Sequence, residues 1–416
     1  MFLKGDFNTL NVLTVNKFYY LKGGSETYLF ALEEELKKRN FKVFPFAMKD
    51  DKNKEALTSE YFVENVDYQQ ANLKKKIDLS LKIIFSKEAY KNIDSLLNQY
   101  KIDIAHLNIF QHQLSPSILR PLKKKNIPVI YTVHDLKVLC PNYKMLSQGE
   151  VCEKCKGGKY YNSLLNKCTK NSTLGSAVNM IEAYVHSFLK TYDKYIDLFI
   201  TPSSFYREKM IEWGFPEDKI VHIPNFINPD DFLPSYTHKD YFLYLGRLSE
   251  EKGIMTLLKA LKETKTNIKM KIVGTGPLED EIANFIINNG LSSKVELLGF
   301  QTGEALSKAI KNSKAVIMPS EWYENGPLSL IESFAYGKLV IGSNIGGIPE
   351  HIDEGENGFL FNPKDYFQLA KVIDEVNELD DVELEKIGHK ARRKVETIYN
   401  NEYYMNKLLE IYNNFI

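Results

Sequence analysis

Two carboxylates in the second half of the chain are spaced to contact the two ends of one anionic ligand. Glu324 and Glu332 lie eight residues apart. Pro327 between them is suited to the first turn of a helix, which predicts that Glu324 precedes the helix and that Glu332 lies on it. Eight helical residues span about 12 Å, and the free amides of a first helical turn favour an anion. The residues at this predicted helix start are Asn325, Gly326, Pro327 and Leu328.

Arg247 and Lys252 place two cations five residues apart in a loop over 246–253 that precedes another predicted helix. Cations are unfavourable near the positive end of a helix dipole, and a bound anion would remove that conflict. The alternative is that both cations pair on the surface with Glu250 and Glu251. We favour the anion site, with the two carboxylates as acceptors of hydroxyl hydrogen bonds.

Two further glycine loops follow predicted strands. Gly23 and Gly24 stand between a strand and a helix, and Gly274 and Gly276 end a later strand. Glycine lets the backbone approach a phosphate closely, although a tight strand-to-helix turn needs glycine in any case. Both alternatives stay open for the first loop. The second loop lacks the third glycine and the later acid of a dinucleotide-binding fingerprint.

His134 follows a predicted strand over 127–133 and precedes Asp135. A side chain at the carboxyl end of such a strand is expected to point toward a ligand between two domains. Because an imidazole can exchange protons near neutral pH, we favour a functional role for His134 over a structural one.

The elements that must position these residues are strands and helices in alternation. Apolar runs alternate with amphipathic stretches, which predicts parallel sheets with crossover helices. A chain of 416 residues is too long for one ordinary core. We therefore predict an α/β fold of two Rossmann-like, doubly wound parallel-sheet domains facing a cleft. The predicted strands cover 11–16, 41–46, 102–108, 127–133, 196–201, 241–246, 268–273, 295–298, 315–319 and 339–343.

Two domains and a terminal helix are predicted. The first domain covers 1–232 and contains an irregular insertion at about 140–185. A segment rich in Pro, Asn and Asp at 223–234 is predicted as the linker. The second domain covers 233–398, and the segment 399–416 contains a last helix near 402–414.

These motifs, in this order, resemble the retaining glycosyltransferases of family 4, which have the GT-B fold. The similarity extends over almost the whole chain. The segments 346–350 and 356–361 also look like blocks of this family. The main motifs that carry the resemblance are 23–26, 132–135, 246–253, 274–277 and the pair Glu324 and Glu332.

The resemblance implies that a sugar is transferred from a nucleotide-sugar donor. Arg247 and Lys252 would hold the donor diphosphate, Glu324 the sugar hydroxyls and Glu332 the ribose, while His134 would lie near the reacting sugar and the acceptor. No metal or other cofactor would be required for catalysis, because the two cations take over the charge. The acceptor would be a glycan or a polyprenyl-linked glycan, in bacterial surface polysaccharide or lipopolysaccharide biosynthesis. The last helix would cross back onto the first domain.

Four cysteines lie within or at the start of the predicted insertion: Cys140, Cys152, Cys155 and Cys168. The two central residues form a C-x-x-C pair, and the outer two could complete a tetrahedral structural zinc site. Free thiols are the alternative. A catalytic zinc is not expected, since four thiolates would leave no open coordination position.

Charge and hydropathy restrict the partners and the location. Fifty-four basic residues balance 54 acidic ones, so nucleic acid is not an expected partner. Without an apolar leader or a long apolar run, we expect a cytoplasmic protein. The stretch 73–97 has lysines opposite apolar residues at helical spacing. It is either a core-facing helix with a basic edge or a helix that contacts an anionic membrane peripherally, at the inner face of the plasma membrane.

Two other classes of function compete with transfer. A nucleotide-sugar 2-epimerase has the same two-domain architecture but lacks the pair Glu324 and Glu332 in this form. A non-catalytic nucleotide-sugar sensor would not need both carboxylates together with Arg247 and Lys252. We favour the glycosyltransferase.

Overall fold

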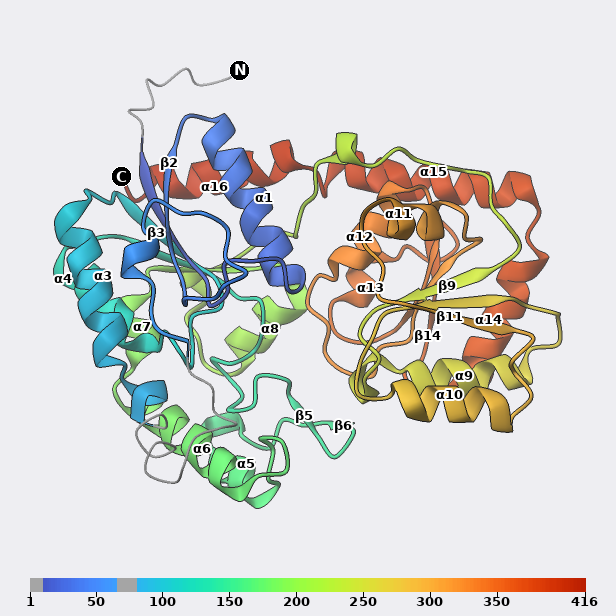
Figure 1. Ribbon diagram of the computed structural model, residues 1–416, viewed down its shortest axis with the longest axis horizontal. Helices are drawn as coiled ribbons and strands as arrows, with labels where there is room; N and C mark the ends of the chain where they lie inside the picture. The colour runs from blue at the N-terminus through green and yellow to red at the C-terminus, as the bar shows by residue number, and fades with distance from the viewer. Residues whose placement is uncertain (1–9, 66–80) are drawn as a thin grey trace.

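A computed structural model describes residues 10–65 and 81–416. Two parallel sheets dominate it, one in each half of the chain (Figure 1). Helices α15 and α16 run one after the other along one side of both halves (Figure 1). This arrangement confirms the prediction of an α/β fold with two doubly wound parallel-sheet domains.

The first sheet has six parallel strands in the order β2-β1-β3-β4-β7-β8. Its central strands are buried almost along their whole length, because helices cover both faces of a parallel sheet. The strands are β1 (Asn11–Val15), β2 (Lys42–Phe46), β3 (Ile104–Leu107), β4 (Val129–Thr132), β7 (Leu198–Thr201) and β8 (Ile220–His222). The helices of this half are α1 (Gly24–Lys38), α3 (Lys87–Gln99), α4 (Leu119–Lys124), α5 (Tyr161–Leu165), α6 (Thr173–Phe188), α7 (Thr191–Tyr195) and α8 (Ser204–Glu212).

The second sheet has six parallel strands in the order β11-β10-β9-β12-β13-β14, the order of the Rossmann fold. The strands are β9 (Phe242–Leu245), β10 (Met270–Val273), β11 (Val295–Gly299), β12 (Val316–Met318), β13 (Val340–Ser343) and β14 (Gly358–Phe361). The helices are α9 (Ile254–Glu263), α10 (Glu279–Asn288), α11 (Gly303–Lys311), α12 (Leu328–Ala335), α13 (Ile348–His351), α14 (Tyr366–Glu378), α15 (Asp381–Thr397) and α16 (Asn401–Asn413).

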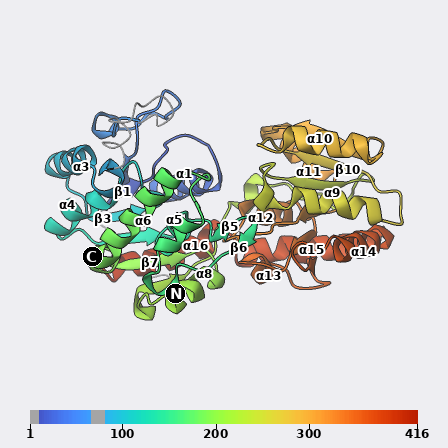
Figure 2. The ribbon, with the colours of Figure 1, turned by 90° about the horizontal axis from the view of Figure 1, so that it is seen from below.

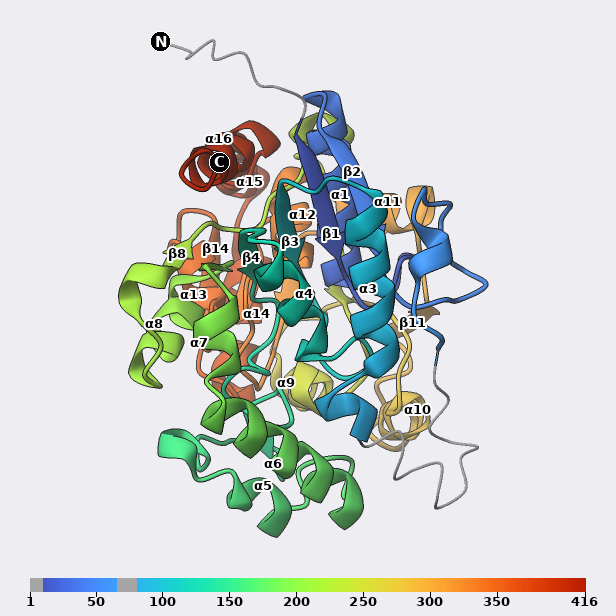
Figure 3. The same ribbon diagram turned by 90° about the vertical axis from the view of Figure 1, so that its left-hand side faces the viewer.

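Helix α16 packs on the first sheet, although it follows the second domain in the chain (Figure 3). Tyr404 and Tyr412 are buried beside Tyr28 of α1 and residues of β1 and β3. The hydroxyl of Tyr412 lies 2.7 Å from Nδ1 of His106 on β3. The terminal helix is therefore part of the core of the first half.

Two edge strands were not predicted. The strands β8 and β14 are short, three and four residues long, and lie at the ends of the two sheets. The segment 223–234, predicted as the linker, begins directly after β8. The predicted insertion contains a two-stranded hairpin of β5 (Leu146–Ser147) and β6 (Glu150–Val151), followed by α5 and α6.

The lysine-rich stretch 73–97 lies partly outside the described residues, which exclude 66–80. In its described part, the Oγ of Ser86 accepts a hydrogen bond from the Ala89 amide and caps α3. Ile93 and Leu96 on α3 are fully buried. This part is a core-facing helix, and Lys74, Lys75 and Lys76 lie outside the described residues. No helix among the described residues is long and apolar enough to cross a bilayer.

Candidate active site

The predicted site residues follow strands at the carboxyl edges of the two sheets, at or beside the point where the strand order reverses. In the first half Gly23 follows β1 and His134 follows β4; in the second half Arg247 follows β9 and Glu324 follows β12. Reversal of strand order opens a crevice at the carboxyl edge, where such sheets bind ligands. The two halves meet here, since the side-chain amide of Asn325 donates to the carbonyl of Val133 over 2.8 Å.

Lys252 and Glu324 form an ion pair at this meeting point. The Lys252 ammonium lies 2.6 Å from Oε1 of Glu324, and Ser320 donates to the same oxygen over 2.7 Å. Lys252 also lies 5.2 Å from the ring centre of Trp322. Burial alone would raise the pKa of Glu324, but the Lys252 charge and the hydrogen bonds to the carboxylate outweigh burial and lower it. Glu324 is therefore an anion with one oxygen held by the protein.

Glu332 lies on α12 as predicted, and it is partly buried without a side-chain partner among the described residues. Burial raises its pKa from 4.5 to about 7. Helix α12 begins at Leu328 with Pro327 as its N-cap, one residue later than predicted. Burying a carboxyl group without a hydrogen-bond partner lowers the stability of a fold. Since no protein side chain occupies the Glu332 carboxyl group, it is available to a ligand.

The loop before α12 is held by the first half of the chain. Ser203 donates to the side-chain oxygen of Asn325 over 3.0 Å, and the Asn225 amide donates to the carbonyl of Gly326 over 2.6 Å. Within the described residues, the backbone N–H groups of Asn325, Gly326 and Leu328 have no protein acceptor. Free N–H groups at a helix start bind anions.

The adjacent glycines Gly346 and Gly347 also support this loop. Their structural role was not predicted from the sequence. A Cβ atom on Gly347 would lie 1.9 Å from the carbonyl oxygen of Asn325, and one on Gly346 would lie 2.5 Å from the Glu324 nitrogen. The Gly347 amide donates to the Glu324 carbonyl over 2.7 Å. In the sequence this pair belongs to the segment 346–350, which resembles a block of the family, but the resemblance assigns it no structural role.

The loop over 246–253 brings Lys252 to Glu324 and leaves Arg247 exposed. Lys252 belongs to a single 3-10 turn, and Gly253 has a φ of 66°. A Cβ atom on Gly253 would lie 1.7 Å from the carbonyl oxygen of Pro319, so glycine is required by close approach and by backbone conformation. The predicted alternative of local pairing does not hold for Lys252, whose partner is Glu324.

The second glycine loop has a packing role. A Cβ atom on Gly274 would lie 1.9 Å from the Gly246 carbonyl oxygen, and one on Gly276 would lie 2.3 Å from that of Leu248. The Gly276 amide donates to the Glu279 carboxylate over 2.6 Å. Gly274 and Gly276 therefore let two site loops lie backbone to backbone, and the Gly276 amide is already occupied.

Gly23 and Gly24 begin α1 and are exposed. A Cβ atom on Gly24 would lie 3.8 Å from the side chain of Leu328, so the starts of α1 and α12 face each other. Burial and the repulsion from nearby cations, Arg247 among them, lower the pKa of Lys22. Cations therefore gather where two helix starts meet, a setting that favours a polyanion.

His134 lies in the same region. One ring nitrogen is 2.9 Å from the side-chain oxygen of Asn108, and the ring packs edge-on against Tyr28 at 4.8 Å. Burial lowers the pKa of His134 to about 3. The imidazole is thus neutral at physiological pH and serves as a hydrogen-bonding group rather than as a cation.

The four cysteines lie in the insertion, and all are free thiols. Burial raises the pKa of Cys155 to about 12, and the other three thiols nearby add to the shift. Although the thiols are neighbours, the described residues include no group of three or more His, Cys, Asp or Glu side chains arranged to hold a metal ion. The structural zinc site at these four cysteines therefore stays a prediction.

Two family models match the chain. The model of glycosyltransferase family 4 matches residues 22–231, and that of glycosyl transferases group 1 matches residues 229–394. Solved structures of GT-B glycosyltransferases have the same two-domain arrangement, and the HepE protein of Anabaena, solved with UDP and glucose, is 17% identical with a TM-score of 0.69. That match covers 97% of this chain and all of HepE. The chain belongs to the family 4, group 1 glycosyltransferases and has the GT-B fold.

Curated relatives are similar over part of their length. An uncharacterized glycosyltransferase of Methanocaldococcus jannaschii is 32% identical over 42% of this chain and 50% of its own. The amylovoran biosynthesis glycosyltransferase AmsK of Erwinia amylovora is 28% identical over 52% of this chain and 56% of its own. The chain thus spans about half the length of these relatives.

Proposed function

We propose that this protein is a retaining glycosyltransferase that transfers a hexosyl group from a nucleotide-sugar donor. The observation that carries the proposal is the Lys252–Glu324 pair beside the unoccupied amides of the α12 start, with Arg247 exposed nearby. Cations with free N–H groups suit a diphosphate, and two flanking carboxylates suit sugar and ribose hydroxyls.

The donor diphosphate lies between the start of α12 and the cations Arg247 and Lys252. Glu324 accepts hydrogen bonds from hydroxyls of the donor sugar through the oxygen that Lys252 and Ser320 leave free. Glu332, further along α12, accepts the ribose hydroxyls. The spacing of Glu324 before α12 and Glu332 on it orients the donor with its sugar toward His134.

In the transfer step an acceptor hydroxyl attacks the anomeric carbon from the side of the leaving group. The bond between the anomeric carbon and the phosphate oxygen breaks, its electrons remain on the phosphate, and the phosphate takes the proton of the attacking hydroxyl. The configuration of the sugar is therefore retained. Arg247 and Lys252 stabilise the charge that develops on the phosphate, which is why the proposal requires no divalent metal.

The proposed acceptor is a glycan or a polyprenyl-linked glycan in bacterial surface polysaccharide biosynthesis. Support for this pathway comes from the biosynthetic name of AmsK. The UDP bound to HepE supports a nucleotide-sugar donor. A lipid-linked acceptor would require a cytoplasmic enzyme that contacts the inner face of the plasma membrane. The epimerase alternative gains no support, because both family models describe transferases.

The test is turnover of a panel of nucleotide sugars with isolated membranes as the source of acceptor. Release of nucleoside diphosphate that depends on the membranes, with a product whose anomeric configuration matches the donor by NMR, is the expected result. Interconversion of donor epimers without an acceptor would reject transfer in favour of isomerisation. An inverted product would reject the retaining mechanism alone.

A further inference from the structure

Helix α6 of the insertion is oriented with its polar side toward the protein. Its buried residues are Ser176, Asn179, Glu182 and His186. A surface helix normally buries its apolar stripe and exposes its polar one. The reversed orientation leaves an apolar stripe facing outward.

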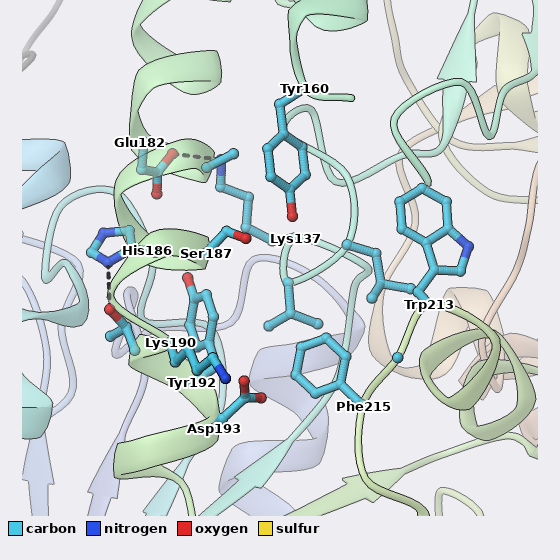
Figure 4. Close-up of a pocket in the computed structure, with 15 residues that line it drawn as sticks. Lys137, Tyr160, Glu182, His186, Ser187, Lys190, Tyr192, Asp193, Trp213 and Phe215 are labelled. Atoms are coloured by element: carbon cyan, nitrogen blue, oxygen red, sulfur yellow. Dashed lines mark hydrogen bonds and ion pairs between the residues drawn. The ribbon is translucent and has the colours of Figure 1, made fainter. Parts of the chain in front are cut away.

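Hydrogen bonds fix this orientation, because each buried polar residue has a partner. Glu182 accepts a hydrogen bond from Lys137 over 2.7 Å, and Nδ1 of His186 lies 3.1 Å from the Thr191 hydroxyl (Figure 4). Asn179 donates to the Thr169 hydroxyl over 2.8 Å. A pocket of about 150 Å³ lies beside these contacts, between this inner side and the body of the first half (Figure 4). Rotating α6 to bury its apolar stripe would break these interactions.

The outward stripe continues onto α5, which lies beside α6 (Figure 3). Phe188 is 88% exposed and Leu165 is 71% exposed, values far above those of core residues. The Tyr161 amide donates to the hydroxyl of Tyr184 over 3.3 Å, which joins the two helices. We name this surface the α5–α6 patch; it consists of Tyr161, Leu165, Leu174, Ile181, Tyr184 and Phe188.

Within the segment 154–190, which carries the α5–α6 patch, the exposed charges have one sign, and the exposed Asp193 follows shortly after it. Between positions 154 and 190 the sequence contains six lysines and a single acid, Glu182. Glu182 is buried and paired with Lys137, so this segment exposes no carboxylate. Lys156 pairs with Glu212, and the other five lysines form no salt bridge within the described residues. Those five, all exposed, are Lys154, Lys159, Lys167, Lys170 and Lys190.

We propose that the α5–α6 patch docks the enzyme on an anionic phospholipid bilayer. Exposed apolar side chains would enter the interfacial region while the lysines meet lipid phosphates, the arrangement of interfacial helices. A second copy of the chain fits less well. A two-fold contact would place identical cationic surfaces opposite each other, with no exposed carboxylate in the segment 154–190 to neutralise them.

The insertion also touches the candidate active site, which gives docking a consequence for catalysis. Lys144 pairs with Glu251, the neighbour of Lys252, over 2.9 Å. The hairpin β5–β6 reaches the second half (Figure 2), where Lys364 donates to the Gly149 carbonyl over 2.7 Å. Docking through the α5–α6 patch would hold the site near a lipid-linked acceptor, a consequence that rests on the proposed function.

The test is co-sedimentation with vesicles of phosphatidylcholine alone or mixed in equal parts with phosphatidylglycerol, at low and high salt. We expect binding to the mixed vesicles that weakens with salt. The double variant Leu165→Ser, Phe188→Ser should lower the partition coefficient by at least roughly tenfold. The matched control Ile287→Ser, which changes a side chain 68% exposed on α10, should bind like the unchanged protein.

A charge variant tests the electrostatic part without altering the apolar residues. Lys167→Ser, Lys170→Ser, Lys190→Ser should lose the preference for the mixed vesicles by roughly tenfold or more, with thermal melting unchanged. The proposal would be overturned if the protein co-sedimented equally with both vesicle types. It would also be overturned if neither the apolar variant nor the charge variant changed vesicle binding. A dimer, measured by light scattering, that the Phe188 variant abolishes would overturn it as well. Donor turnover, followed in parallel, reports on the proposed function independently of vesicle binding.

Discussion

The Lys252 ammonium lies 2.6 Å from Oε1 of Glu324, although 72 residues separate the two in the chain. The contact joins the loop after β9 to the loop after β12, two strands that are neighbours in the second sheet. It holds the cation at the position where we propose that the donor phosphate leaves, and it leaves one oxygen of Glu324 for a sugar hydroxyl.

Removing the Lys252 ammonium is predicted to slow sugar transfer strongly. Lys252→Ala, and equally Arg247→Ala, should cost about 2–4 kcal/mol of transition-state stabilisation, because preorganised charges act on the leaving phosphate. Steady-state turnover of the folded variants checks this. The control is Lys259→Ala on the exposed side of α9, which should be unchanged; similar losses in all three variants would reject the specific role.

Glu324→Gln is predicted to impair turnover more than nucleoside diphosphate binding. The amide keeps a hydrogen-bond acceptor for the sugar but removes the charge that orients Lys252. The effects of Glu324→Gln and Lys252→Ala should be less than additive in the double variant, since the two side chains act as one unit. Loss of diphosphate binding with turnover of bound donor preserved would contradict the assignment.

Glu332 is predicted to make both stability and ligand binding depend on pH. Its pKa is about 7 in the fold against 4.5 ordinarily, so the folded state holds an extra proton between these values. The free energy of unfolding should therefore fall as pH rises across that window. Glu332→Gln should remove this dependence, so that the variant melts higher than the unchanged protein at pH 8.

Nucleotide affinity should show the opposite trend with pH. A charged Glu332 is the better acceptor for ribose hydroxyls, so affinity should rise as pH increases through about 7. Calorimetric titration with a nucleoside diphosphate at several pH values measures this affinity. A flat profile in the unchanged protein, or the same profile in Glu332→Gln, would assign the ribose contact to another residue.

Two glycines at the site are predicted to respond differently to alanine. Gly253→Ala should destabilise the fold by at least about 1–3 kcal/mol, because its positive φ and its approach to Pro319 exclude a side chain. Gly23→Ala should cost less, about 1 kcal/mol or below through the poorer N-cap, since its φ is −168° and the atom nearest to a Cβ would lie 3.7 Å away. Thermal melting compares them; equal melting temperatures would disprove the steric argument.

A chelator is predicted to leave catalysis intact. Turnover measured within minutes of adding EDTA should match the untreated enzyme, because Arg247 and Lys252 neutralise the diphosphate in place of a metal. Metal analysis of the same sample by mass spectrometry tests separately whether the four cysteines bind zinc. Immediate loss of turnover that magnesium restores would contradict metal-independent transfer.

Much of the fold could be predicted because its information is local. Strands such as β1 and β9 are mainly apolar runs followed by glycine loops, and Pro327 marks the start of α12 within one residue. The edge strands β8 and β14 escaped prediction because three or four residues carry too little periodicity. The reversed orientation of α6 escaped it as well, since the partners of its polar residues lie elsewhere in the chain.

The candidate site was predictable as residue types but not as contacts. The pairing of Lys252 with Glu324, rather than with a neighbouring acid, depends on the order of β9 and β12 in the sheet. The bridge from Asn325 to Val133 spans 192 positions, and no local pattern announces it. Desolvation of Glu332 and His134 likewise arises only from packing.

Calorimetric titration with nucleoside diphosphates tests the central claim most directly, because it asks whether the start of α12 and the two cations form a diphosphate site. We predict saturable binding of at least one nucleoside diphosphate to the unchanged protein and to Lys259→Ala. Binding should be weakened roughly tenfold or more in Arg247→Ala and Lys252→Ala, as for charge-assisted phosphate contacts. Equal affinity in all four proteins, or no binding of any nucleoside diphosphate, would contradict the account.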